Sequence, residues 1–337
     1  MPRDIFLIWL VLFLCGAAAA CKGKTLPPEQ TPEYSAVEPQ AEQEEAEPVT
    51  KAVDNDIQVS YHVQRPLSDF SGKLPAFGVN VSEISPLNYE NPDPVILKQM
   101  GVEPYMVSFF AGEQFYRSGD FDKALAEYTV SIRSNGEFAG AYFSRGNAWL
   151  KKGDYKRAID DYTRSIKLDG GRRADIFNYR GYARAERGET ALAIEDYSQA
   201  IALNPNYTDA LINRAHALYE TGEYDRVIDD CSRVIRLEPH NASIWNRRGS
   251  AWYCKRDDDR AIKDFTEAIR IKSGYALAFY NRGNAWYSKG ELDRALADIN
   301  RALDINPSFA GAHTSRENIL RLLENPKSAA ADFAQKR

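Results

Sequence analysis

Histidine and cysteine are scarce in this chain, which has four of each among its 337 residues. No histidine has the close spacing to a second histidine or to cysteines that a metal site needs. No nucleophile stands beside a general base in a recognisable catalytic pattern either. The sequence therefore predicts a non-enzymatic protein without a metal ion or another cofactor.

A strong excess of one charge is also absent. The net charge is −5, and residues 105–337 hold 33 acidic and 36 basic side chains. Residues 1–104 are acidic, with 15 acidic and 7 basic side chains. Because the C-terminal two thirds of the chain is nearly neutral, its overall charge gives no support to nucleic acid as a partner.

Long apolar runs are missing as well. The run at residues 5–14 is roughly half as long as a membrane-spanning helix requires. A basic residue precedes it and small residues follow it, which predicts a secretory signal peptide at residues 1–20. The sequence Ala-Ala-Ala-Cys that ends at Cys21 resembles a bacterial lipobox, although that motif usually begins with leucine. The resemblance implies a lipid such as palmitate on Cys21 and, with Lys22 next to it, sorting to the outer membrane. Ordinary cleavage or an uncleaved anchor are the alternatives.

Two segments of unusual composition follow the signal peptide. Residues 21–59 are acidic and rich in proline and glutamate, with too few large apolar side chains to offset the entropic cost of ordering, so a disordered tether is predicted. Residues 60–104 have apolar residues without helical spacing, interrupted by prolines, which predicts an irregular segment with a short helix near residues 95–100. This segment either covers the end of the following domain or occupies its binding surface as an internal ligand.

The rest of the chain repeats a pattern of 34 residues. Each copy has two stretches of helical apolar spacing joined by a short turn, which predicts a pair of amphipathic helices. One pair cannot bury its apolar face alone, so the copies are expected to stack. The six copies are residues 105–138, 139–172, 174–207, 208–241, 242–275 and 276–309. Residues 310–324 look like a first helix without a second and are predicted to form a cap, followed by a tail at residues 325–337.

Two positions of this unit carry the clearest pattern. Position 8 holds Gly112, Gly146, Gly181, Ala215, Gly249 and Gly283. Position 20 holds Ala124, Ala158, Ala193, Val227, Ala261 and Ala295. These residues resemble the motif of the tetratricopeptide repeat (TPR) family, from which Arg184 and Cys231 depart where aromatic residues are usual. The resemblance implies an all-α, right-handed superhelical solenoid of six helix-turn-helix repeats with a capping helix.

The repeats contain two cysteines. Cys231 takes a position of the repeat that lies between helices, and a buried thiol is the favoured interpretation. A disulfide with Cys254 is the alternative, and the sequence alone does not decide between them.

Arginine recurs at position 7 and an acid at position 23. The arginines are Arg145, Arg180, Arg214, Arg248, Arg282 and, in the cap, Arg316. The acids are Glu127, Asp161, Asp196, Asp230, Asp264 and Asp298. Because the first repeat lacks the arginine and the cap lacks the acid, each acid is expected to pair with the arginine of the following repeat, 18 or 19 residues later. The alternative to this structural ladder is a basic stripe that binds phosphates.

The family resemblance also implies a concave groove lined by the first helices. The groove positions fall on Asn147, Asn178, Tyr182, Asn213, His216, Asn246, Arg247, Tyr280, Asn281 and Asn284. Amides donate and accept hydrogen bonds and tyrosine adds rigid contact area, so the groove is predicted to bind a peptide or a glycan. Asn213 and Arg247 match two places of the carboxylate clamp of chaperone-binding members, but Ser243 stands where a lysine belongs, so that clamp is incomplete.

These features together predict a membrane-anchored scaffold of the bacterial cell envelope, on the periplasmic side or the outside of the outer membrane. Its groove is expected to bind a peptide of a protein partner. The alternative is a surface-exposed lipoprotein adhesin that binds host protein or glycosaminoglycan.

Overall fold

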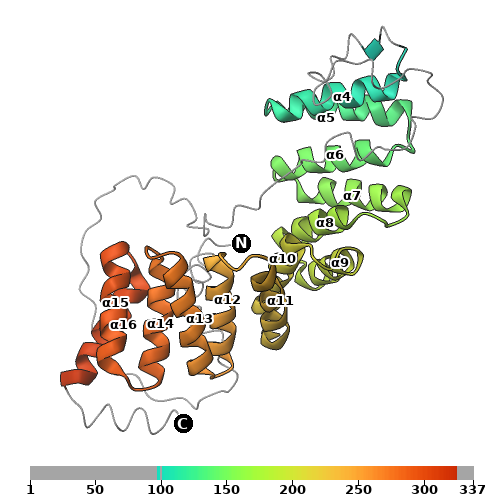
Figure 1. Cartoon of the computed structure of the whole chain (residues 1–337). Helices are drawn as coiled ribbons and strands as arrows, with labels where there is room; N and C mark the ends of the chain where they lie inside the picture. The colour runs from blue at the N-terminus through green and yellow to red at the C-terminus, as the bar shows by residue number, and fades with distance from the viewer. Residues whose placement is uncertain (1–96, 99–100, 325–337) are drawn as a thin grey trace, which may run out of the picture. The chain divides into compact units, whose positions relative to one another are not determined.

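The computed structural model describes residues 97–98 and 101–324, and every regular element in these ranges is an α-helix (Figure 1). The first helices of the pairs are α4 (Pro104–Arg117), α6 (Ala139–Lys151), α8 (Ala174–Glu186), α10 (Thr208–Glu220), α12 (Ala242–Cys254) and α14 (Ala276–Ser288). The second helices are α5 (Phe121–Ser134), α7 (Tyr155–Asp169), α9 (Thr190–Leu203), α11 (Tyr224–Leu237), α13 (Asp258–Ile271) and α15 (Leu292–Ile305). A single helix, α16 (Ala310–Glu324), follows the last pair. The all-α class predicted from the sequence is confirmed.

Several predictions concern residues outside the described part of the chain. The signal peptide, the lipid site at Cys21, the tether and the tail all lie there. Of the short helix expected near residues 95–100, Leu97 and Lys98 are described, and both are helical.

Two compact units divide the chain. The four pairs α4–α11 belong to one unit, and α12–α16 belong to the other. Within each unit every helix packs on the next helix along the chain, and each first helix also touches the first helix of the neighbouring repeat. The first helices of a unit therefore form one continuous wall, whose exposed side is called the inner face below.

The two helices of a pair meet where position 8 faces position 24. A methyl group added to Gly112, Gly146, Gly181 or Gly249 would lie only 2.6 to 2.8 Å from the aromatic ring at position 24 of the same repeat. Those rings belong to Tyr128, Tyr162, Tyr197 and Phe265, which are almost fully buried. The fourth repeat has Ala215 at position 8 and the smaller Cys231 at position 24, both buried. A larger residue on one helix is thus matched by a smaller one on the other, which explains why Cys231 departs from the family pattern.

The turn inside each pair requires a left-handed backbone at position 15. Five repeats have glycine there with φ between 74° and 81°, and the fifth repeat has Arg256 with a φ of 64°. A side chain in this conformation costs roughly 1–2 kcal/mol, whereas glycine adopts it freely but loses more entropy on folding. Arg256 is therefore a strained residue at a position where glycine fits.

Changing Arg256 to glycine is expected to raise the free energy of unfolding by about 0.5–1 kcal/mol, because the relieved strain exceeds the added entropy cost. Urea denaturation of the full chain, followed by circular dichroism, measures this change. Arg256→Ala is the matched control, since it removes the same charge and keeps a side chain at the left-handed position. If Arg256→Ala stabilises as much as Arg256→Gly, the effect comes from the charge and not from the backbone.

Candidate functional site

The arginines at position 7 pair with the acid at position 23 of their own repeat. Each guanidinium donates two hydrogen bonds of 2.7 to 3.0 Å to one carboxylate, 16 residues later in the chain. The pairs are Arg145–Asp161, Arg180–Asp196, Arg214–Asp230, Arg248–Asp264 and Arg282–Asp298. The predicted pairing of each acid with the arginine of the following repeat is therefore wrong. The two helices of one pair already bring positions 7 and 23 face to face, so the closest acid is the one in the same repeat.

The two ends of the array behave differently from its middle. Glu127 has no arginine at position 7 of its own repeat, where Ala111 stands. Arg316 in the cap lies beside His313, with its Nη2 atom 3.4 Å from the Nδ1 atom of that histidine. Asp298, the acid predicted to pair with Arg316, is bound by Arg282 instead.

A third nitrogen of the same guanidinium groups reaches the preceding repeat. In four places Nη1 donates to a hydroxyl at position 25 of that repeat, over 2.9 to 3.2 Å. The acceptors are Thr129, Thr163, Ser198 and Thr266. The arginines thus do link neighbouring repeats, but through hydroxyl groups and not through acids. The guanidinium groups therefore stabilise the fold through these hydrogen bonds, which argues against a basic stripe that binds phosphates.

Burial and pairing act in opposite directions on these carboxylates. Burial raises the pKa of Asp161 and Asp264, and the hydrogen bonds and charge of their arginines lower it. The pKa of Arg145 is raised by its hydrogen bonds to Asp161. Because a guanidinium stays protonated in proteins, each pair is held by charge-assisted hydrogen bonds.

Most of the amides predicted to line the groove have hydrogen-bond partners within the protein. Nδ2 of Asn213 donates to Oδ1 of Asn178, and Nδ2 of Asn281 donates to Oδ1 of Asn246, each over 3.0 Å. Asn147 accepts a hydrogen bond of 2.7 Å from the Tyr162 hydroxyl. All but Asn213 are largely buried. The Asn178–Asn213 and Asn246–Asn281 bonds join neighbouring first helices, whereas Asn147 joins the two helices of its own repeat. Contact of these amides with a partner stays a prediction.

Other predicted groove residues are more open. The side chain of His216 is 51% exposed, and its Nδ1 atom lies 3.7 Å from Oε1 of Glu220. Arg247 is half-buried, and its Nε atom has no hydrogen-bond partner among the described residues. Asn284 accepts a hydrogen bond of 3.3 Å from Ser315 of the cap, and the Tyr280 ring lies 4.7 Å from that of Phe309.

The sequence patterns did not reveal two further contacts. Arg184 donates from Nη1 to Oδ2 of Asp196 over 2.8 Å, so that this aspartate binds two arginines. Arg173, the residue inserted between the second and third repeats, binds Asp175 and lies over the Phe143 ring, 4.6 Å from its centre. The insertion itself was the available signal, since it places one extra side chain next to the first helix of the third repeat.

Family comparisons bear on this arrangement of paired helices. Three tetratricopeptide repeat models match the chain, one at residues 111–175 and 212–276, one at 181–222 and one at 276–309. Together these matches cover more than half of the chain. The chain belongs to the tetratricopeptide repeat family. The TPR fold supports a role in protein–protein interaction.

Solved structures show the same TPR fold. The chain is similar to the C-terminal part of a TPR repeat-containing protein from Cytophaga hutchinsonii, with 15% identity over 66% of this chain and 98% of that one, and a TM-score of 0.52. It is similar to the APC/C hetero-tetramer Cut9-Hcn1, with 17% identity over 67% of this chain and 45% of that one, and a TM-score of 0.50. A MamA protein structure is 25% identical over 52% of this chain and 94% of that one, with a TM-score of 0.49. No curated protein matches the chain in sequence.

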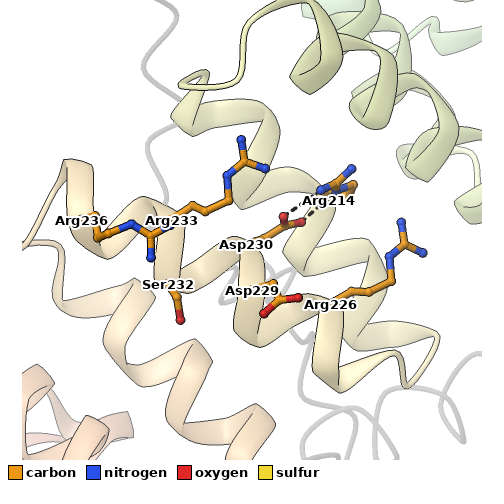
Figure 2. A pocket seen from close by; sticks show the side chains of 7 residues that line it. All are labelled: Arg214, Arg226, Asp229, Asp230, Ser232, Arg233 and Arg236. Carbon is orange, nitrogen blue, oxygen red and sulfur yellow. Dashed lines mark hydrogen bonds and ion pairs between the residues drawn. The ribbon is translucent and has the colours of Figure 1, made fainter.

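One open hollow lies beside α10 and α11 of the TPR array (Figure 2). Its lining residues are Arg214, Arg226, Asp229, Asp230, Ser232, Arg233 and Arg236. Figure 2 shows the Arg214 side chain directed at Asp230, its ion-pair partner. Arg226 donates to Glu223 and Arg233 to the backbone oxygen of Pro205. Three of its four arginines therefore have acceptors within the protein.

The described TPR region also bears on membrane attachment and on cysteine chemistry. None of its helices is long and apolar enough to cross a membrane. Cys231 and Cys254 both carry thiols there, and Cys231 is buried as predicted.

Proposed function

We propose that this chain is a lipid-anchored, non-enzymatic TPR scaffold of the bacterial cell envelope that binds a peptide of a protein partner on its inner face. The proposal rests on a difference between the arginines at position 7 and the polar residues predicted to line the groove. The arginines at position 7 are bound to acids and hydroxyl groups of the fold, whereas His216, Tyr182 and Arg247 keep surface on the first helices. Polar and aromatic side chains at such places favour an extended peptide.

The anchoring part of the proposal rests on the N-terminal sequence. The run at residues 5–14, the small residues after it and Cys21 fit a lipoprotein signal, and Lys22 favours the outer membrane. A long acidic segment between Cys21 and the repeats gives the array a reach of several tens of ångströms from the bilayer if it behaves as a coil.

The surface adhesin remains the second candidate, and one structural observation weighs against its glycosaminoglycan form. Polyanion binding requires free cations, and the five arginines at position 7 of the second to sixth repeats are each paired with an acid of the same repeat. A peptide-binding scaffold requires no such cations.

A photocrosslinking experiment tests the scaffold function. Benzoylphenylalanine is placed at His216 on the inner face or at the exposed Glu195 on α9, and both proteins are expressed in cells of the source organism. We expect His216, and not Glu195, to give one crosslinked band of defined mass. Equal crosslinking from both sites, or none from His216, would contradict binding on the inner face. Cys21→Ala is expected to release the protein from the membrane fraction, and retention of that variant there would contradict the lipid anchor.

A further inference from the structure

The hollow beside α11 contains two charged side chains that the fold does not pair. Among the described residues, neither Arg236 nor Asp229 has a hydrogen bond or an ion pair. Arg233 uses one of its five N–H groups, in the bond to the backbone oxygen of Pro205. Asp229 lies four residues before Arg233, where helical ion pairs form, but the arginine donates to Pro205 instead. The hollow therefore keeps guanidinium N–H groups that are available to a ligand.

The second repeat has the same order of charges on its second helix and serves as a comparison. The corresponding side chains are Arg157, Asp160, Asp161, Arg164 and Lys167 in the second repeat and Arg226, Asp229, Asp230, Arg233 and Arg236 in the fourth. In the second repeat the arginines lie over aromatic rings. Arg157 lies 4.4 Å from the centre of the Trp149 ring, and Arg164 lies 5.9 Å from that of Tyr142. These rings cover part of each guanidinium group.

The fourth repeat lacks both rings. Leu218 and Leu211 stand at the two ring positions, and both leucines are buried. Arg226 therefore pairs with Glu223, and the two side chains are 46% and 43% exposed. A surface pair of this kind contributes at most about 1 kcal/mol, so an acceptor from another molecule can replace it. The loss of the two rings accounts for the open, arginine-lined space at this repeat.

The charge and the size of the hollow suit an anionic ligand. Four arginines and two aspartates line it, which leaves an excess of two positive charges. Its volume of about 490 Å³ lies within the range of about 300–1,000 Å³ that is typical of ligand pockets. Figure 2 shows Arg226 and Arg233 on either side of the Arg214–Asp230 pair. Arg236 lies three helical turns, or about 15 Å, from Arg226, so the row fits several carboxylates along a peptide better than one small ion.

We propose that Arg226, Arg233 and Arg236 form a docking site for an acidic peptide segment of a protein partner, on a second helix and apart from the inner face. Carboxylates of the segment accept charge-assisted hydrogen bonds from the guanidinium groups. A long polysaccharide would need cations over several repeats, but the third repeat has Gln199 and Ala202 at the positions of Arg233 and Arg236. An acidic peptide is therefore the fitting occupant. This site adds a second contact surface to the scaffold function proposed above.

The test uses the full chain and a fluorescein-labelled dodecapeptide of alternating glutamate and serine, with fluorescence anisotropy as the readout. The Arg233→Gln/Arg236→Gln variant is expected to bind this peptide about tenfold more weakly, because two charge-assisted contacts are lost. Arg164→Gln/Lys167→Gln is the matched control, since it removes the same two charges at the same positions of the second repeat, and its affinity should equal that of the wild-type chain.

Two single variants separate binding from folding. Arg236→Gln breaks no hydrogen bond or ion pair among the described residues, so it is expected to weaken binding about threefold with an unchanged melting temperature. Asp229→Asn removes a negative charge from the hollow and is expected to strengthen binding about threefold. Weaker binding by Asp229→Asn would contradict an anionic occupant.

Two further results would overturn the docking site. Equal weakening by the two double variants would mean that the peptide follows overall charge. Tighter binding of a heparin hexasaccharide, lost in Arg233→Gln/Arg236→Gln, would mean that the site takes a polysaccharide. The crosslinking experiment tests the inner face separately. If position 216 crosslinks a partner but Arg233→Gln/Arg236→Gln leaves peptide affinity unchanged, the docking site is wrong and the scaffold function stands.

Discussion

Changing Asp196 to alanine is expected to lower the free energy of unfolding by about 3–5 kcal/mol, the range found when one partner of a buried ion pair is removed. Asp196 is 2% exposed and accepts hydrogen bonds from both Arg180 and Arg184. The side chains of these arginines are only 13% and 17% exposed. Without the carboxylate, two largely buried guanidinium groups would face each other without a counter-charge.

Urea denaturation of the full chain, followed by circular dichroism, measures this loss. Asp264→Ala serves as the comparison, because Asp264 is 5% exposed, holds the same position of its repeat and accepts from one arginine, Arg248, among the described residues. We expect Asp196→Ala to be the more damaging of the two. A loss below about 1 kcal/mol, which is typical of a surface ion pair, would show that solvent screens these arginines.

Changing Cys231 to tyrosine is expected to lower the free energy of unfolding by about 1–3 kcal/mol through overpacking. In the first three repeats a tyrosine at this position faces a glycine so closely that a methyl group would lie 2.6 to 2.8 Å from its ring. The fourth repeat has Ala215 at the glycine position, and both Ala215 and Cys231 are almost fully buried. The new ring would therefore meet the Ala215 methyl group.

A second substitution, at Ala215, tests whether the loss of stability comes from a clash between these two positions. Adding Ala215→Gly to Cys231→Tyr recreates the pair found in the first three repeats, and most of the lost stability should return. Ala215→Gly alone should destabilise the chain, since it leaves a gap beside Cys231 and places glycine inside a helix. Additive losses in the double variant, measured by the same denaturation, would show that the two positions do not pack against each other.

The sequence was sufficient to predict where the helices begin, but it was not sufficient to predict which side chains pair between them. Helices α6, α8, α10, α12, α14 and α16 begin at the first residue of a 34-residue copy or of the cap, because apolar spacing and turn residues determine helix limits locally. The partner of Asp161 was a different problem. Arg145 lies 16 residues before it and Arg180 lies 19 residues after it, and a strict repeat offers both choices in every copy. The choice between the two arginines depends on which helices pack against each other in the folded chain.

The candidate site was predictable in the same uneven way. Family positions predicted that the first helices line a groove, and the structure shows that neighbouring first helices touch. They did not reveal that Asn178 and Asn213 bind each other, since a bond between amides 35 residues apart depends on how closely two helices approach.

The guanidinium groups at position 7 have a consequence for how the array unfolds. Arg145, Arg180, Arg214 and Arg282 each bind an acid of their own repeat and a hydroxyl of the preceding one. In a linear array, cooperativity is set by the balance between the intrinsic stability of a repeat and its coupling to the next. One side chain contributes here to both quantities, so its loss weakens a repeat and its boundary in the same step. A partner that contacts both repeats at such a boundary would therefore bind only where both repeats are folded.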